Sequence, residues 1–126
     1  VNTLKHLVKE KFVNNPALCY LPTSVEIFED QGVKFQLRLL NPSLKATGLS
    51  PKPKDPFAPP FEDGLFLGGV TKSHSVVFNK FCVCDEHVVC FPNEFERQDT
   101  PLTVQDIEAA TTVIAELNAF MFFNCG

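Results

Sequence analysis

The chain has 126 residues, a formal net charge of −4 and a hydrophobic fraction of 44%, so residues 1–126 are expected to form a single domain with its own core. The acidic balance argues against a nucleic-acid partner, because a nonspecific nucleic-acid binder needs a basic face. No apolar run approaches the ~18 residues that cross a bilayer, and no signal-peptide core opens the chain, so we expect no membrane partner.

The first predicted elements are a helix and a β-hairpin. Residues 2–12 carry apolar side chains at helical spacing on one face, namely Leu4, Leu7, Val8 and Phe12. Residues 24–29 and 33–40 predict two strands joined by the turn Asp30-Gln31-Gly32. In the second strand apolar and polar residues alternate, which predicts one face in water and one apolar face turned to a core.

A proline-rich loop and three strands are predicted next. Residues 41–63 contain six of the ten prolines, and each proline removes a backbone donor and fixes φ. The segment is therefore predicted to be a long loop, of a length that is often functional. Residues 65–70, 74–81 and 86–91 are predicted to be strands.

The last part of the chain predicts a helix and then a buried strand. Residues 104–117 are expected to be helical, with Thr103 as the N-cap and Asp106 reaching back to it. The stripe expected to face the core is Val104, Ile107, Ala110, Thr111, Ile114 and Leu117. Residues 120–123 are all large and apolar, which indicates a buried strand. This order of elements predicts an α+β fold, with helices packed on an antiparallel sheet.

The five cysteines permit two interpretations. An odd number of cysteines without a secretory signal favours reduced thiols and a cytoplasmic location. Cys82, Cys84 and Cys90, with His87 nearby, also offer zinc ligands, although a structural zinc site usually spaces its cysteine pair by about two to four residues. We favour buried free thiols, and we expect no metal and no cofactor.

The chain contains no complete catalytic set. His6, His74 and His87 have no neighbouring groups that form a recognised nucleophilic triad, and no phosphate-binding glycine motif is present. Lysines do gather in the proline-rich loop, at Lys45, Lys52 and Lys54, and Lys80 follows Asn79 at the end of a predicted strand. These lysines suit phosphate binding, but surface loops often carry lysines without any ligand.

Several segments in a fixed order resemble the N-terminal half of the diadenosine tetraphosphate phosphorylases, also called ATP adenylyltransferases. The matching segments are FQLRL from Phe35, DPFAPP from Asp55, FNKF from Phe78, EHVVCFPNEFERQ from Glu86, PLTVQDIEAA from Pro101 and FFNCG from Phe122. Together they span roughly residues 30–126. The resemblance implies a histidine-triad-like fold, in the galactose-1-phosphate uridylyltransferase branch, that is incomplete at the C-terminus of this chain.

The resemblance also implies a reaction and a set of binding residues. The family converts diadenosine tetraphosphate and phosphate to ATP and ADP through a nucleotidyl-histidine intermediate. The nucleophile sits in an H-x-H-x-Q motif that would lie after Gly126, so this chain is expected to hold no catalytic residue. Asn79 and Lys80 match the strand-end pair that contacts the nucleotide, Asn124 opens the phosphate loop, and Lys45 is the nearest match to a phosphate-binding lysine.

We therefore expect the nucleotide-binding N-terminal part of a phosphorylase, with diadenosine tetraphosphate, ATP, ADP or phosphate as its small-molecule partner. The alternative is a non-catalytic nucleotide-binding or regulatory protein that lacks the catalytic half. A third possibility is a structural domain that supplies a face to a partner chain. Self-association through residues 119–126 is expected, because their apolar run would form an exposed sheet edge.

Overall fold

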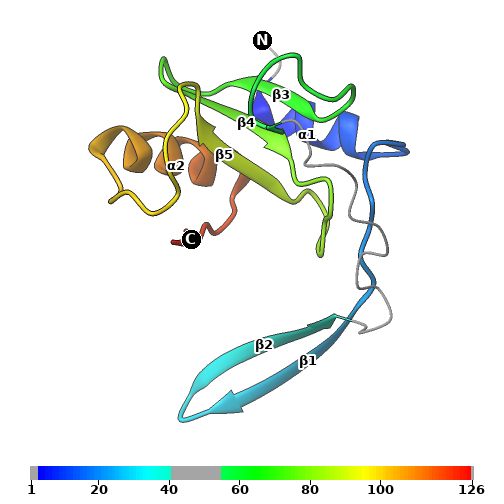
Figure 1. Ribbon diagram of the computed structural model, residues 1–126. Helices are drawn as coiled ribbons and strands as arrows, with labels where there is room; N and C mark the ends of the chain where they lie inside the picture. The colour runs from blue at the N-terminus through cyan, green and yellow to red at the C-terminus, as the bar shows by residue number, and fades with distance from the viewer. Residues whose placement is uncertain (1–2, 41–54, 126) are drawn as a thin grey trace.

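The computed structural model describes residues 3–40 and 55–125 (Figure 1). The α+β fold predicted from the sequence is confirmed, with antiparallel strands and helices packed on them. In this part of the chain the elements are α1 (Leu4–Phe12), β1 (Thr23–Asp30), β2 (Val33–Leu40), β3 (Phe66–Gly69), β4 (His74–Phe78), β5 (Val88–Pro92) and α2 (Val104–Leu117). Neither described helix is long and apolar enough to cross a membrane.

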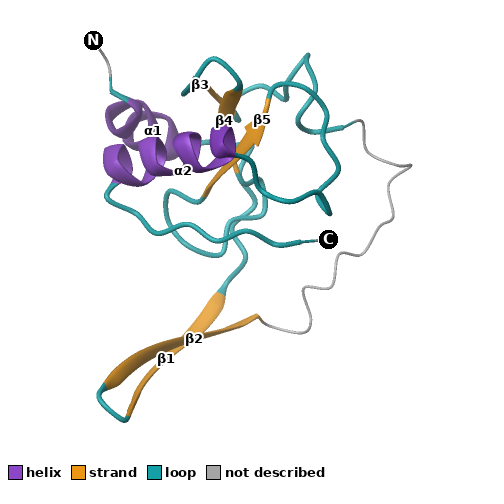
Figure 2. Ribbon diagram, turned by 90° about the vertical axis from the view of Figure 1, so that its left-hand side faces the viewer, coloured by secondary structure: helices purple, strands orange, loops and turns teal. Residues whose placement is uncertain are grey.

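The body of the molecule is a three-stranded antiparallel sheet in the order β3-β4-β5. The two helices lie side by side against one face of this sheet (Figure 2). Val8 of α1 and Val113 of α2 pack there against Val76 and Phe78 of β4. The apolar face predicted for the first helix is confirmed, since Val8 is buried and its three partners are packed against the same core.

Aromatic residues from the segment before β3 cover the other face of the sheet. The ring of Phe61 stacks on that of Phe66 with centroids 4.2 Å apart, and it meets Phe91 edge-on at 6.1 Å. Phe57 also packs on Phe91, at 5.0 Å. Residues 55–63 form no helix or strand, as predicted for the proline-rich loop, whereas residues 41–54 of that loop lie outside the described residues.

Strands β1 and β2 form a hairpin that projects away from the body (Figure 1). Its turn places Gln31 and Gly32 at φ 49° and 80°, the positive values that a two-residue hairpin turn requires and that glycine adopts without strain. The hairpin was predicted correctly, but its apolar face is not covered. The apolar side chains of β2 on that face are 43–54% exposed.

Helix α2 has the predicted bounds, but the core stripe predicted for it is only partly correct: Leu117 packs against the core, whereas the two fully buried residues were not in the stripe. Thr103 and Asp106 form the expected capping box. The residues buried against the sheet are Ala109 and Val113, whereas Val104 is 81% exposed. The helix carries apolar side chains on two faces, and the sheet covers the face that the sequence pattern did not single out.

The segment after α2 corrects another prediction. Residues 120–123 form no strand and are exposed, with Phe120 at 85% and Phe122 at 63%. A strand needs a neighbour to satisfy its backbone donors and acceptors, and strand propensity alone does not provide one. The predicted strand over 74–81 is also shorter in the structure, ending at Phe78, where an irregular loop begins.

Candidate functional site

The central strand β4 places Asn79 and Lys80 at its C-terminal end. Asn79 is fixed there because its backbone N–H donates to the carbonyl of His87 at 2.8 Å, and its side-chain Oδ1 accepts from the N–H of Phe81 at 3.1 Å. Both residues are half-buried. The backbone of the predicted pair is therefore anchored beside the core, and the binding role of the pair stays a prediction.

The ammonium group of Lys80 is paired with a carboxylate from the loop before β3. Lys80 Nζ lies 2.7 Å from Oε1 and 2.9 Å from Oε2 of Glu62, and the two side chains remain 41% and 50% exposed. The Lys80 carbonyl accepts from the N–H of Cys19 at 2.7 Å. No pattern in the sequence indicated Glu62, because a partner 18 residues away on a loop follows no local periodicity.

His87 lies beside Asn79 and is held neutral. Burial lowers the pKa of His87, because desolvation disfavours the imidazolium form. Its Nε2 is 3.5 Å from the Asn79 side-chain nitrogen, a long contact, and its Nδ1 is buried without a hydrogen-bond partner among the described residues. A histidine in this setting can orient Asn79 but carries no charge toward a ligand.

The other two residues of the predicted site are not seen in contact with this pair in the described part of the chain. Asn124 lies in the exposed tail after α2, where its backbone carbonyl accepts from the side chain of Gln98 at 2.6 Å. Lys45 lies outside the described residues. The phosphate-binding roles of both residues stay predictions.

A buried histidine–aspartate pair that the sequence did not indicate joins helix α2 to β4. The His74 side chain is 5% exposed, and its Nε2 lies 2.9 Å from Oδ1 of Asp106. Oδ2 of the same carboxylate accepts from the backbone and the hydroxyl of Thr103, and these bonds, followed by the one from His74, lower the pKa of Asp106. Asp106 is visible in the sequence as a capping residue, but its bond to a strand 32 residues earlier is not.

Ser73 extends this pair into a serine–histidine–aspartate series, with its Oγ 3.0 Å from His74 Nδ1. Acyl transfer by such a series also needs backbone donors for the oxyanion. The N–H groups of Ser73 and His74 instead both donate to the hydroxyl of Thr71, at 3.3 and 3.1 Å. The arrangement therefore joins the sheet to the helix, and these two backbone donors are already used.

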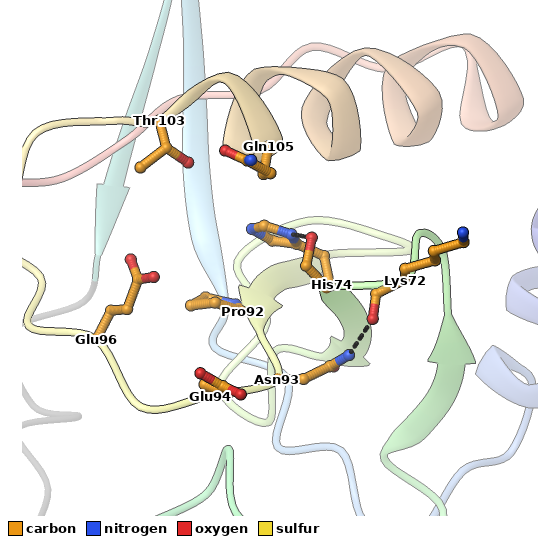
Figure 3. Close-up of a pocket in the computed structure, with 9 residues that line it drawn as sticks. Lys72, His74, Pro92, Asn93, Glu94, Glu96, Thr103 and Gln105 are labelled. Carbon is orange, nitrogen blue, oxygen red and sulfur yellow. Dashed lines mark hydrogen bonds between the residues drawn. The ribbon is translucent and has the colours of Figure 1, made fainter.

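A hollow of about 420 Å³ opens beside this joint (Figure 3). It is lined by Lys72, Ser73, His74, Pro92, Asn93, Glu94, Glu96, Thr103 and Gln105. Asn93 spans its floor, donating to the Lys72 carbonyl at 3.3 Å and accepting from the Ser75 hydroxyl at 2.6 Å. Two glutamates against one lysine make the hollow unfavourable for a phosphate group. It lies at the start of β4, at the opposite end of the strand from Asn79 and Lys80.

The cysteines are free thiols. Cys82 is buried, and its Sγ points to the Cys19 carbonyl at 3.8 Å. Burial raises the pKa of the Cys90 thiol to about 11, with a smaller effect from Asp106. Within residues 3–40 and 55–125, no group of three His, Cys, Asp or Glu side chains is placed to hold a metal ion.

Comparison with known proteins decides the family. The sequence matches the Ap4A phosphorylase N-terminal domain over residues 2–126. The chain belongs to this family. The resemblance that the sequence segments carried is thereby confirmed. No curated protein matches the chain.

Solved structures of yeast Ap4A phosphorylase Apa2 share the fold. The complex with AMP superposes with a TM-score of 0.72 at 26% identity, over 91% of this chain and 39% of that one. The structure described without a ligand gives 0.73 at 26% identity, over 93% and 38%. The complex with Ap4A gives 0.71 at 25% identity, over 90% and 39%. This Ap4A phosphorylase N-terminal domain thus spans less than half the length of the yeast enzymes that it matches.

Proposed function

We propose that the chain is the nucleotide-binding N-terminal part of a diadenosine tetraphosphate phosphorylase of the cytoplasm. Family membership supports this proposal, together with the likeness to yeast Apa2 structures described with AMP and with Ap4A. The observation that carries it is the match to the Ap4A phosphorylase N-terminal domain over residues 2–126, within which Asn79 and Lys80 directly follow the buried central strand. In the proposed reaction, diadenosine tetraphosphate and phosphate give ATP and ADP.

Each proposed residue has a distinct task. Lys80 presents a point charge on a flexible stem, which can follow a phosphate oxygen. The amide of Asn79 offers a directional donor to the nucleotide, and the resemblance adds Asn124 and Lys45 as further phosphate contacts. A nucleotidyl-histidine would form on a histidine that this chain does not contain, within the histidine-triad-like fold that we propose for the whole protein.

The second candidate is a non-catalytic nucleotide-binding or regulatory protein. The state of the three histidines favours it for the chain taken alone. His74 is bonded to Asp106, His87 is buried beside Asn79, and His6 is exposed on α1 at 3.8 Å from Glu10. His87 meets the Asn79–Lys80 pair through its Nε2, at 3.5 Å from the Asn79 side-chain nitrogen, whereas the contacts of His74 and His6 lie elsewhere. Both candidates require nucleotide binding, and they differ in turnover.

Nucleotide binding, which both candidates require, is tested by titrating the chain with ATP and with diadenosine tetraphosphate. Calorimetry or NMR measures the dissociation constants. Replacing Lys80→Ala should raise the dissociation constant about tenfold, since a charge-assisted contact is worth roughly 1.5–3 kcal/mol. Lys72→Ala is the matched control, because this lysine lies at the other end of β4. Equal affinities of wild type and Lys80→Ala would remove Lys80 from the site.

An assay for phosphorolysis separates the two candidates. We expect no turnover of diadenosine tetraphosphate by the 126-residue chain, because it lacks the proposed nucleophile. Turnover that disappears when one of its own histidines is replaced would overturn this assignment of roles. Adding a segment that contains the H-x-H-x-Q motif should create activity if the parent is a phosphorylase, and should leave a regulatory protein inactive.

A further inference from the structure

Glu62 forms an ion pair with the ammonium group of Lys80, the group that the proposed site offers to phosphate. Two hydrogen bonds, of 2.7 and 2.9 Å, run from Lys80 Nζ to the two carboxylate oxygens. An ammonium group has three donors, so this carboxylate uses most of them. The side chains are 41% and 50% exposed, and water competes for both charges, so the pair contributes little net stability and is readily broken.

The fold imposes this pairing through the backbone on both sides. The carbonyl of Glu62 accepts from the N–H of Leu65 at 3.2 Å, and the carbonyl of Leu65 accepts from Phe78 of β4 at 2.9 Å. The turn that carries Glu62 is thereby tied to the end of the strand that carries Lys80. Lys80 is fixed in turn by its carbonyl bond to Cys19. Glu62 therefore faces Lys80 because of its place in the structure, and the contact does not depend on a mobile loop.

We propose that Glu62 competes with phosphate oxygens for Lys80 and so weakens phosphate binding at this position, an inference that rests on the proposed function. A ligand gains the Lys80 contact only by breaking the Glu62–Lys80 pair, and its affinity is reduced by the cost of breaking that pair. Removing the carboxylate frees the donors of the ammonium group for a phosphate oxygen.

The test is a double-mutant cycle on the 126-residue chain, with ATP as the ligand. Glu62→Gln should tighten ATP binding roughly two- to fivefold, the range set by the loss of an exposed ion pair. In the Lys80→Ala background the same substitution should have no effect, because the competition no longer exists. Glu108→Gln removes the same charge from the exposed face of α2 and should leave the affinity unchanged.

Two results would overturn the proposal. The first is an ATP affinity that is unchanged or weaker in Glu62→Gln. The second is an equal gain in the Lys80→Ala background, which would indicate a general charge effect. Failure of the proposed function looks different, since in that case Lys80→Ala would leave the ATP affinity unchanged whatever Glu62→Gln does.

Discussion

Replacing Asp106→Ala should destabilise the fold by about 2–4 kcal/mol. The carboxylate accepts from the Thr103 backbone at 2.6 Å, the Thr103 hydroxyl at 2.7 Å and His74 Nε2 at 2.9 Å, and its side chain is 18% exposed. Loss of the capping interaction costs about 1 kcal/mol. Leaving the buried His74 nitrogen without a partner adds roughly 1–3 kcal/mol. A domain of this kind has about 5–15 kcal/mol in total, so the loss is a large fraction of its stability.

Urea unfolding followed by circular dichroism measures this change as a lower midpoint at an unchanged slope. The control is Glu108→Gln, an exposed position on the same helix, which should stay within about 0.5 kcal/mol of wild type. The cost of Thr103→Ala should not add to that of Asp106→Ala, because the two residues share their bonds. A loss of stability below about 0.5 kcal/mol for Asp106→Ala would contradict the role of Asp106 in joining the helix to the sheet. Full additivity of the Thr103→Ala and Asp106→Ala costs would contradict the bonds that the two residues share.

The same carboxylate should make the fold acid-sensitive. Hydrogen bonds from Thr103, and then from His74, hold the pKa of Asp106 below its ordinary value of 3.8. Its contribution is therefore complete above the unfolded-state pKa and is lost as the pH falls through the lower folded-state value. We expect the stability difference between wild type and Asp106→Ala to shrink below about pH 4.

Three further predictions follow from burial and exposure. Iodoacetamide at pH 8 should alkylate exposed Cys19 well before Cys90, because burial raises the pKa of the Cys90 thiol to about 11. Mass spectrometry locates the label, and equal rates at the two cysteines would contradict the burial of Cys90. Because burial lowers the pKa of His87 below 6.5, urea midpoints should fall as the pH drops below that value, and His87→Gln should flatten this dependence. The chain should self-associate, and Phe122→Ser should lower the average molar mass measured by light scattering. If only Leu37→Glu lowers this mass, the contact between copies lies on the hairpin.

Local chemistry explains which parts of the fold could be predicted from the sequence. The bounds of α2 follow from the capping box of Thr103 and Asp106 and from apolar residues at helical spacing, all within one segment. The buried face of α2 depends instead on the sheet that covers it. Ala109 and Val113 lie on one apolar face and Val104 on another, and only tertiary packing chooses between them. The periodicity identified the helix but not its rotation about its own axis.

Contacts between residues distant in the sequence limit how much of the site can be predicted from the sequence. Asn79 and Lys80 could be named as candidates because they lie in a segment that resembles the family, and their role stays a prediction. Glu62 and the bond between His74 and Asp106 could not, because each joins segments that are distant in the sequence. The strand predicted over residues 120–123 is wrong for a related reason. Its side chains favour a strand, but strand formation depends on a neighbouring chain segment, which no local pattern reveals.

The position of β4 between β3 and β5 has a consequence for how the chain would bind a ligand. All five of its residues are buried, so its amide protons should exchange with deuterium only when the whole domain opens. Asn79 and Lys80 directly follow this strand. Their backbone is therefore expected to be ordered before any ligand binds. Binding then has to order little more than the side chain of Lys80, whose flexible stem reaches outward from the least mobile part of the molecule.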